Sequence, residues 1–234
     1  MLAKNKIVMT TDLRNKPYNK ILVEFEDFSN LILKQIDLLN KIFELSENTI
    51  PKEITKQLAE NENKIDEFEN KLDNHIIRAI VLYKPVASDL RHLFAIYRMV
   101  INLERIGDLI MKIYKFHILN NSSEDLHNML KLTSEMVNNA LLSFFNSDKK
   151  LAVWTIERDD IIDKLNREFL NKKIENIKIE EESKRLLQDL INKKTIASCF
   201  ERIADHSTNI AEATIYSLLG KDVRHTNKDI NEEI

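Results

Sequence analysis

The chain has 234 residues, a formal charge of −3, 43% hydrophobic residues and 31% charged residues. It contains only two glycines and three prolines, fewer than the turns of a sheet protein need, so the composition predicts an all-α protein with one large or two small domains. The small net charge excludes a general attraction to nucleic acid or anionic lipid, and no apolar run approaches the roughly 18 residues of a membrane span.

Two features of the sequence bear on its cellular compartment. The opening stretch MLAKNKIVMTTDLRNK has too short an apolar segment for a secretory signal peptide. Cys199 is the only cysteine, which excludes an internal disulfide and fits a reducing environment. We interpret Cys199 as a small buried hydrophobe rather than a redox or metal-binding thiol. The sequence therefore predicts a cytoplasmic protein without membrane insertion.

Apolar residues recur every three or four positions along most of the chain, which predicts amphipathic helices. Residues 1–17 lack this rhythm and are predicted to be a disordered or frayed N-terminus. Three helices are expected over about 18–45, 51–82 and 87–118, with Pro51 in the first turn of the second and Pro85 before the third. Together they predict a first three-helix bundle over residues 18–120.

The polar segment LNNSSED at 119–125 is the best linker candidate, with Ser122 or Ser123 as the N-cap of the helix that follows. Three further helices are expected over about 124–145, 149–178 and 180–219, and Gly220 is expected to end the last one. They predict a second three-helix bundle over residues 123–220, followed by a mobile C-terminal tail at 221–234.

The second bundle repeats the first at a constant offset of 97 residues. The alignment needs no gap from Glu62 to Ile113, and it pairs charged as well as apolar positions. A gapless register of this kind indicates two tandem pseudo-symmetric three-helix bundles. Gly107 and Ala204 also align, and we interpret these small residues as allowing close helix packing rather than as hinges. Aligned identities include Ile65 with Ile162, Asp66 with Asp163, Leu90 with Leu187, Leu93 with Leu190, and Glu104 to Ile106 with Glu201 to Ile203.

The repeat aligns four pairs of acidic residues, each pair four positions apart. Such residues are neighbours on a helix, and like charges there cost roughly 0.2 to 0.5 kcal/mol per pair. A short turn joins the second and third helices of the first bundle, so these helices run antiparallel as neighbours and can bring four carboxylates together. The pairs are Glu62 with Asp66, Glu104 with Asp108, Asp159 with Asp163, and Glu201 with Asp205.

Four carboxylates shared by two helices outline a site for a hard cation, and Mg²⁺, Ca²⁺, Mn²⁺ or iron suit such a site better than zinc. The alternative is that the acids are solvated and paired with neighbouring bases. Arg105 and Arg202 lie three residues before the second acid of their pairs, and Lys112 follows Asp108 by four. The spacing alone leaves both interpretations open. We interpret His206 as an ordinary surface histidine rather than a ligand.

The sequence gives no positive support for an enzyme. A ferritin-like di-iron site needs two Glu-x-x-His motifs, and only EDLH at 124–127 is present. The two glycines are too far apart for a phosphate-binding loop, and no convincing Ser–His–Asp or Cys–His arrangement is found. We therefore predict a protein without catalytic residues.

Three segments resemble the PhoU family of bacterial phosphate-signalling proteins: KPVASDLRHLFAIYRMVINLERIGDLI at 84–110, ERDDIIDKLN at 157–166 and CFERIADHSTNIAEATIYSLLGKDVRH at 199–225. The likeness covers about 18–225. It implies two pseudo-symmetric three-helix bundles, each with an acid-x-x-x-Asp motif that can bind multinuclear clusters of divalent or trivalent metal ions. The identity of the metal is open among iron, Mn, Mg, Zn and Ca. By resemblance, the motif residues are Glu104, Asp108, Glu201 and Asp205, and Asp66 and Asp163 match the family's helix-two acids.

The resemblance also implies partners. Proteins of this family are cytoplasmic, often dimeric, and restrain the phosphate-starvation response. They are thought to link the phosphate ABC transporter to a sensor histidine kinase. The chain is therefore expected to be a regulatory adaptor that forms a homodimer and contacts the ATPase subunit of such a transporter and a kinase, with no nucleic acid among its partners. A metal-storage or metal-dependent hydrolytic bundle, and a purely structural bundle with solvated acids, are the alternatives.

The two halves differ before their third helices, where PVASDLR at 85–91 aligns with ESKRLLQ at 182–188. Two interpretations of the first string are kept. In one, Ser88 or Asp89 caps the helix. In the other, Asp89 and Arg91 contact a partner, and the second half does not take part in that contact.

Overall fold

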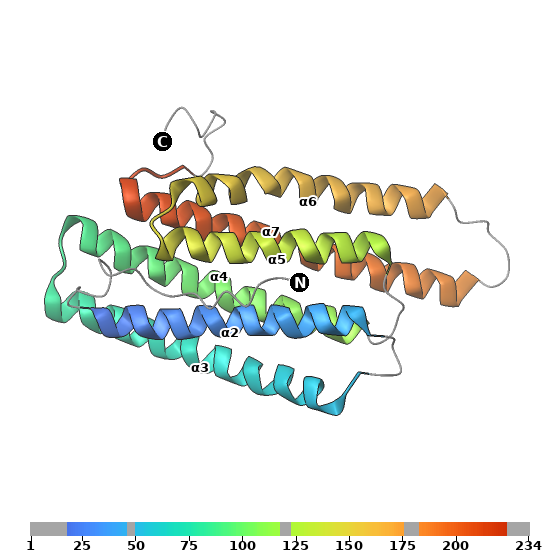
Figure 1. Cartoon of the computed structure of the whole chain (residues 1–234), viewed down its shortest axis with the longest axis horizontal. Coiled ribbons are helices and arrows are strands. Elements are labelled where there is room, and N and C mark those ends of the chain that lie inside the picture. The colour runs from blue at the N-terminus through green and yellow to red at the C-terminus, as the bar shows by residue number, and fades with distance from the viewer. Residues whose placement is uncertain (1–17, 46–49, 118–122, 176–182, 224–234) are drawn as a thin grey trace.

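The computed structural model describes residues 18–45, 50–117, 123–175 and 183–223, and the side chains of this part except those of 170–175 and of Ser183. Over these residues the chain forms helices and no strand, which confirms the predicted all-α class (Figure 1). The helices are α2 (Asn19–Glu44), α3 (Lys52–Tyr83), α4 (Ala87–His117), α5 (Glu124–Phe145), α6 (Lys149–Glu175) and α7 (Ser183–Leu219).

The helix bounds agree closely with the periodicity, and the differences lie at helix ends. Pro51 is the N-cap residue of α3, one position before the first turn in which it was expected. Ser123 is the N-cap residue of α5 but makes no capping hydrogen bond with its side chain. Gly220 has φ +71° just after α7, which confirms it as the helix stop. The expected ends of α6 and the start of α7, the N-terminal residues 1–17 and the tail from 224 lie outside the described residues.

The turn between α3 and α4 is set by two residues in left-handed conformations. Lys84 has φ 45° and Ala87 has φ 46°, on either side of Pro85 and Val86. Because α4 already begins at Ala87, Asp89 lies within its first turn. The prediction that Ser88 or Asp89 caps this helix is therefore wrong.

The helices are arranged as two sets of three, α2–α4 and α5–α7, which confirms the predicted tandem bundles (Figure 1). The bundles are not separate bodies. The most extensive helix contact in the described chain joins α4 of the first set to α7 of the second. A second contact joins α2 to α5, where Phe25 packs against Phe144 and Phe145 with ring centroids 5.5 Å from each.

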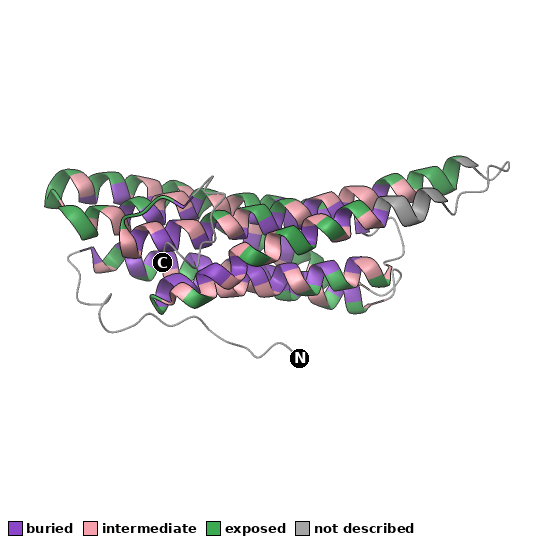
Figure 2. Cartoon of the chain, turned by 90° about the horizontal axis from the view of Figure 1, so that it is seen from above, coloured by how far each residue is buried: buried purple, intermediate pink, exposed green. Residues whose placement is uncertain are grey.

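One buried apolar cluster runs through all six helices (Figure 2). Helix α2 is buried on more than one side, because it packs against α3, α4 and α5. Tyr18, just before α2, is 2% exposed and donates a hydrogen bond from its hydroxyl to Asp89 Oδ1 at 3.2 Å. That contact ties the start of α2 to the start of α4. Among the described helices, none combines the length and the hydrophobicity that crossing a bilayer would require.

Candidate metal centres

The first acidic cluster lies between α3 and α4. Glu62 and Asp66 come from α3 and Glu104 and Asp108 from α4, and the charges of the other three acids all act to raise the pKa of Glu62. The antiparallel packing of the two helices therefore brings all four carboxylates together. Gly107, one residue before Asp108, faces the α3 side chains beside the cluster, because a Cβ placed on it would lie 3.5 Å from Glu62 Oε2.

The electrostatics of this cluster disfavour four negative charges. Burial, followed by the charges of Asp108, Asp66 and Glu104, raises the pKa of Glu62 to about 7. Burial and Asp108 also raise the pKa of Glu104, against the opposing effect of Arg105. The pKa of Glu62 therefore places its protonation change near neutral pH.

Arg105 gives partial support to the interpretation of solvated, paired acids. Its guanidinium lies 3.3 Å from Glu104 Oε2 and 3.6 Å from Asp108 Oδ2. The contact with Glu104 lacks hydrogen-bond geometry, and Glu104 Oε2 and Glu62 Oε2 are both buried without a hydrogen-bond partner. One exposed arginine thus leaves the inner carboxylate oxygens of the cluster unsatisfied, which is costly for buried oxygens unless another cationic or donor group binds them.

The second acidic cluster lies between α6 and α7 at the positions that the repeat predicts. Burial, then the charges of Asp205 and Asp163, raises the pKa of Asp159 to about 6. Burial and Asp163 also raise the pKa of Glu201 and of Asp205. The four carboxylates of the second half are therefore close enough to disfavour one another's charge, as in the first half.

The second cluster has polar partners that the first lacks. Asn166 donates a hydrogen bond from its amide to Glu201 Oε2, and it accepts one from Lys194 Nζ at 2.7 Å. The charge of Lys194 acts to lower the pKa of Glu201. Thr208 Oγ1 lies 3.3 Å from Asp159 Oδ1 and donates to it. Part of the negative charge in this cluster is therefore balanced by the chain itself.

The first cluster instead gains another acid, Glu69, and Asp73 lies close to it. With the offset of 97, Glu69 occupies the place of Asn166 and Tyr97 that of Lys194. Burial, then Asp73, raises the pKa of Glu69, and Asp66 and Asp108 act in the same direction. The first cluster thus contains more carboxylate and no equivalent of the lysine.

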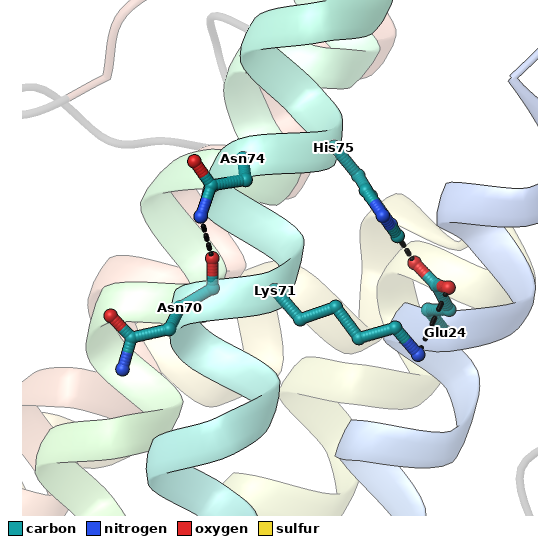
Figure 3. Close-up of polar contacts among 5 residues, drawn as sticks. All are labelled: Glu24, Asn70, Lys71, Asn74 and His75. Atoms are coloured by element: carbon teal, nitrogen blue, oxygen red, sulfur yellow. Dashed lines mark hydrogen bonds and ion pairs between the residues drawn. The ribbon is translucent and has the colours of Figure 1, made fainter.

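Glu24 is a buried acid outside the clusters that has two basic partners (Figure 3). Its side chain is 9% exposed, with Oε2 2.6 Å from His75 Nδ1 and Oε1 3.1 Å from Lys71 Nζ. Burial acts to raise its pKa, but the hydrogen bonds and charges of His75 and Lys71 outweigh burial, so the pKa of Glu24 is lowered. The cluster acids Glu62 and Asp159 are shifted in the opposite direction, because neither has such cations.

The small residues of the repeat act as expected for close packing. A Cβ on Gly107 would lie 3.1 Å from Ile65 Cδ1 and 3.2 Å from Ile65 Cγ2. At the aligned position of the second half, the methyl group of Ala204 is fully buried, and Ile162 takes the place of Ile65. The second helix pair therefore accommodates one more methyl group than the first at this point.

The carboxylate clusters fit a hard cation in donor chemistry but are not closed around one. Within the described part of the chain, no three His, Cys, Asp or Glu side chains stand at the mutual spacing of a preformed metal shell. Oxygen ligands and flexible geometry suit Ca²⁺, Mg²⁺ and related ions. The buried, unpartnered oxygens of Glu62 and Glu104 are the groups that a cation would satisfy. Binding would require small side-chain rotations that draw the carboxylates inward.

Three other predicted residues are placed by the structure. His206 is not an ordinary surface residue: its Nδ1 lies 2.9 Å from Asn102 Oδ1 on α4, and burial, then Arg202 and Arg105, lowers its pKa to about 4. It links the two halves and takes no part in either cluster. Cys199 is buried and unpaired, as expected for a small hydrophobe. The Arg91 side chain lies beside Gly220, so Arg91 contacts the end of α7.

Sequence reasoning missed Glu69, Asn166 and Lys194 as parts of the clusters. For Glu69 and Lys194, the spacing along the helix is a signal in the sequence. Glu69 follows Glu62 by seven residues, and Lys194 precedes Glu201 by seven, which places each on the same helix face as its cluster. The link through Asn166 requires knowledge of how α6 packs on α7.

The pattern of the family described as the PhoU domain matches residues 25–116 and 126–214. These two matches fall one on each half and include all eight cluster acids. The chain belongs to the PhoU family. A curated PhoU homologue from Aquifex aeolicus, named a phosphate-specific transport system accessory protein, is 31% identical over 215 residues, which are 88% of this chain and 96% of the relative. A protein of the same name from Pseudomonas aeruginosa is 30% identical over 203 residues, covering 83% of this chain and 81% of the relative.

Solved structures of PhoU proteins share the fold. The crystal structure of PhoU from Pseudomonas aeruginosa has a TM-score of 0.76 and 26% identity, and the match covers 86% of this chain and 97% of that one. The crystal structure of the phosphate transport system regulatory protein PhoU from Streptococcus pneumoniae has a TM-score of 0.75 at 23% identity, covering 88% and 97%. The arrangement of the two PhoU-type halves around α4 and α7 is therefore that of the family.

Proposed function

We propose that this protein is a cytoplasmic regulator of phosphate uptake that restrains the phosphate-starvation response when phosphate is plentiful. It acts as a metal-binding helical adaptor and has no catalytic residue of its own. Its partners are the ATPase subunit of a phosphate ABC transporter and a sensor histidine kinase, and it works as a homodimer. The role in phosphate transport is supported by the names of its relatives, which are accessory proteins of the phosphate-specific transport system.

The metal part of the proposal rests on one observation: each half gathers four carboxylates whose mutual repulsion raises the pKa values within the cluster. The repulsion is unfavourable in the metal-free chain, and a bound cation would remove it. Glu62, Asp66, Glu104 and Asp108 would hold the ion or ions of the first half. Asp159, Asp163, Glu201 and Asp205 would hold those of the second. A cation there would supply positive charge and brace each helix pair.

Elemental analysis of the purified protein tests the metal sites. The variant Glu104→Ala/Asp108→Ala/Glu201→Ala/Asp205→Ala should contain far less metal than the parent chain. A matched control replaces four exposed acids, Glu53, Glu60, Glu67 and Glu157, by alanine and should keep the metal content of the parent. Equal metal content in the parent and the cluster variant would end the metal proposal.

A deletion strain tests the regulatory role. Loss of the protein should raise expression of phosphate-uptake genes in high phosphate, and the parent chain should restore repression. Normal repression in the deletion strain would contradict the proposal. Phosphoester turnover by the metal-loaded protein, if lost in Glu104→Ala, would instead favour a hydrolytic function for the same carboxylates.

A further inference from the structure

The turn between α3 and α4 carries the largest concentration of exposed apolar side chains in the described chain. Thirteen large hydrophobic residues are exposed over the described chain, and seven of these fall between residues 77 and 94. We name this surface the apolar tip: Ile77, Val81, Leu82, Tyr83, Val86, Leu90 and Phe94. It lies at one end of the elongated molecule, where α3 turns back into α4 (Figure 1). Contiguous exposed apolar surface of this kind usually marks an interaction site.

The last turn of α3 is apolar on all its sides. Val81, Leu82 and Tyr83 are consecutive, so their side chains point in directions about 100° apart around the helix, yet they are 66%, 66% and 55% exposed. Val86 in the turn is 75% exposed. A protein partner that docks on one face would cover only part of this surface. A medium that surrounds the projecting turn can cover all of it.

The charges around the apolar tip are basic. The chain has no aspartate or glutamate between Asn74 and Ser88, while Arg78 and Lys84 are exposed in this stretch. Lys20, from the start of α2, lies beside the tip and lines a shallow pocket with Arg78, Leu82 and Tyr83. The formal charge of −3 for the whole chain therefore conceals a local excess of positive charge at this end.

The backbone conformation of the turn exposes Val86. Lys84 and Ala87 hold left-handed conformations that fold the chain back sharply, so Val86 projects at the turn. Asp89, the nearest acid after the turn, accepts the hydrogen bond from Tyr18. Its carboxylate is thus engaged by a hydroxyl donor at the start of α2.

We propose that the apolar tip docks into the interface of an anionic lipid membrane. Val81, Leu82 and Val86 would enter the boundary between headgroups and acyl chains, and Tyr83 would lie at headgroup depth. Lys20, Arg78 and Lys84 would contact anionic headgroups, which attract basic residues near a bilayer surface. The chain would lie against the bilayer by this end without spanning it.

Vesicle binding of the full chain tests the proposal. The protein should sediment with phosphatidylcholine/phosphatidylglycerol vesicles (3:1), bind much more weakly to pure phosphatidylcholine, and bind less as salt screens the basic groups. Leu82→Asp/Val86→Asp should lower the affinity more than tenfold. Each of Arg78→Gln and Lys84→Gln should lower it by about fivefold, the loss expected for one basic residue near an anionic surface.

The second half offers a matched control. Leu186 and Leu187, at the start of α7, are 48% and 55% exposed. The variant Leu186→Asp/Leu187→Asp therefore also replaces two exposed aliphatic side chains by aspartate, at the opposite end of the molecule (Figure 1). This variant should bind vesicles like the parent. An equal loss in both double variants, or no binding of the parent to anionic vesicles, would overturn the proposal.

A fluorescent reporter locates the contact. The variant Leu82→Cys, labelled with an environment-sensitive dye, should brighten on adding anionic vesicles, whereas Leu187→Cys should not; Cys199 is buried and is not expected to react. Brightening of the Leu82 label with a partner protein but not with vesicles would assign the surface to a protein and overturn the lipid proposal. The vesicle assay and the deletion strain test different proposals. Failure of vesicle binding would leave the regulatory role untouched, and normal repression in the deletion strain would leave the membrane contact untouched.

Discussion

The two acidic clusters occupy equivalent positions in the repeat but balance their charge differently. In the second half, Lys194 reaches Glu201 through the amide of Asn166, and Thr208 hydrogen-bonds Asp159. In the first half, Glu69 stands in place of Asn166 and adds a carboxylate. In both clusters burial and neighbouring carboxylates raise the pKa of one inner acid, to about 7 for Glu62 and to about 6 for Asp159. Two equivalent sites of a duplicated fold can thus differ in how far the chain itself balances their negative charge.

The largest predicted effect is stabilisation by metal. At about one hundred times its dissociation constant, Mn²⁺ should stabilise the chain by about 2.7 kcal/mol, a rise in Tm of roughly 5 to 10 °C. Glu104→Ala/Asp108→Ala should remove more of this rise than Glu201→Ala/Asp205→Ala, since the first cluster has more carboxylate and no lysine. Calorimetry with and without Mn²⁺ measures both. Equal losses would show that the internal partners of the second cluster do not weaken its attraction for cations.

The next effect is the pH dependence of the metal-free chain. A raised carboxyl pKa means that folding favours the protonated form, so the contribution of Glu62 is complete below its unfolded pKa near 4.5 and is lost as pH rises through about 7. At pH 8, Glu62→Gln should stabilise the metal-free chain by about 1 to 2 kcal/mol, since solvent screens the half-buried carboxylate.

Asp159→Asn is the matched variant in the second half. The contribution of Asp159 is lost between about pH 3.8 and 6, so the gain at pH 8 should be smaller than for Glu62→Gln. Denaturant unfolding at pH 5 and pH 8 measures the two gains. A gain for Glu62→Gln that is as large at pH 5 as at pH 8 would contradict the assigned titration.

The third prediction concerns a substitution that makes the second cluster resemble the first. Lys194→Met removes the internal cation and the hydrogen bond to Asn166, and should destabilise the metal-free chain by about 1 kcal/mol. The same change should strengthen Mn²⁺ binding by about tenfold, which corresponds to about 1.4 kcal/mol. Isothermal titration and urea unfolding give the two values. The exposed Lys164, on the outer side of α6, supplies the control Lys164→Met, which should leave Mn²⁺ affinity unchanged.

The smallest net effect is expected for Gly107→Ala, between α3 and α4. Gly107→Ala gains about 1 kcal/mol of helix propensity, but its Cβ would press on Ile65 at 3.1 Å, so the net change in unfolding free energy should stay below about 1 kcal/mol. Ala204→Gly, at the aligned position, loses both propensity and a buried methyl group and should cost about 1 to 2 kcal/mol. Urea unfolding compares them. A large loss in Gly107→Ala would show that the first helix pair cannot adjust.

Much of the fold could be read from apolar periodicity, because amphipathic helices in a bundle bury one face at regular spacing. Helix α5 was predicted with the bounds that it has, and α2 and α4 to within a residue or two. The errors lie at helix ends, at Pro51 and at Asp89, where a single backbone conformation decides the boundary. The left-handed Ala87 could not be expected, since only glycine adopts that conformation without strain.

By itself, the sequence determined that there are two equivalent halves and which carboxylates each half brings together, since both follow from helix spacing and a gapless repeat. The tertiary structure alone decided which of those carboxylates have partners. Asn166 reaches Glu201 only because α6 packs on α7, and His206 links the two halves only because α7 packs on α4. Charge balance depends on distances between helices, and spacing along one helix does not contain them.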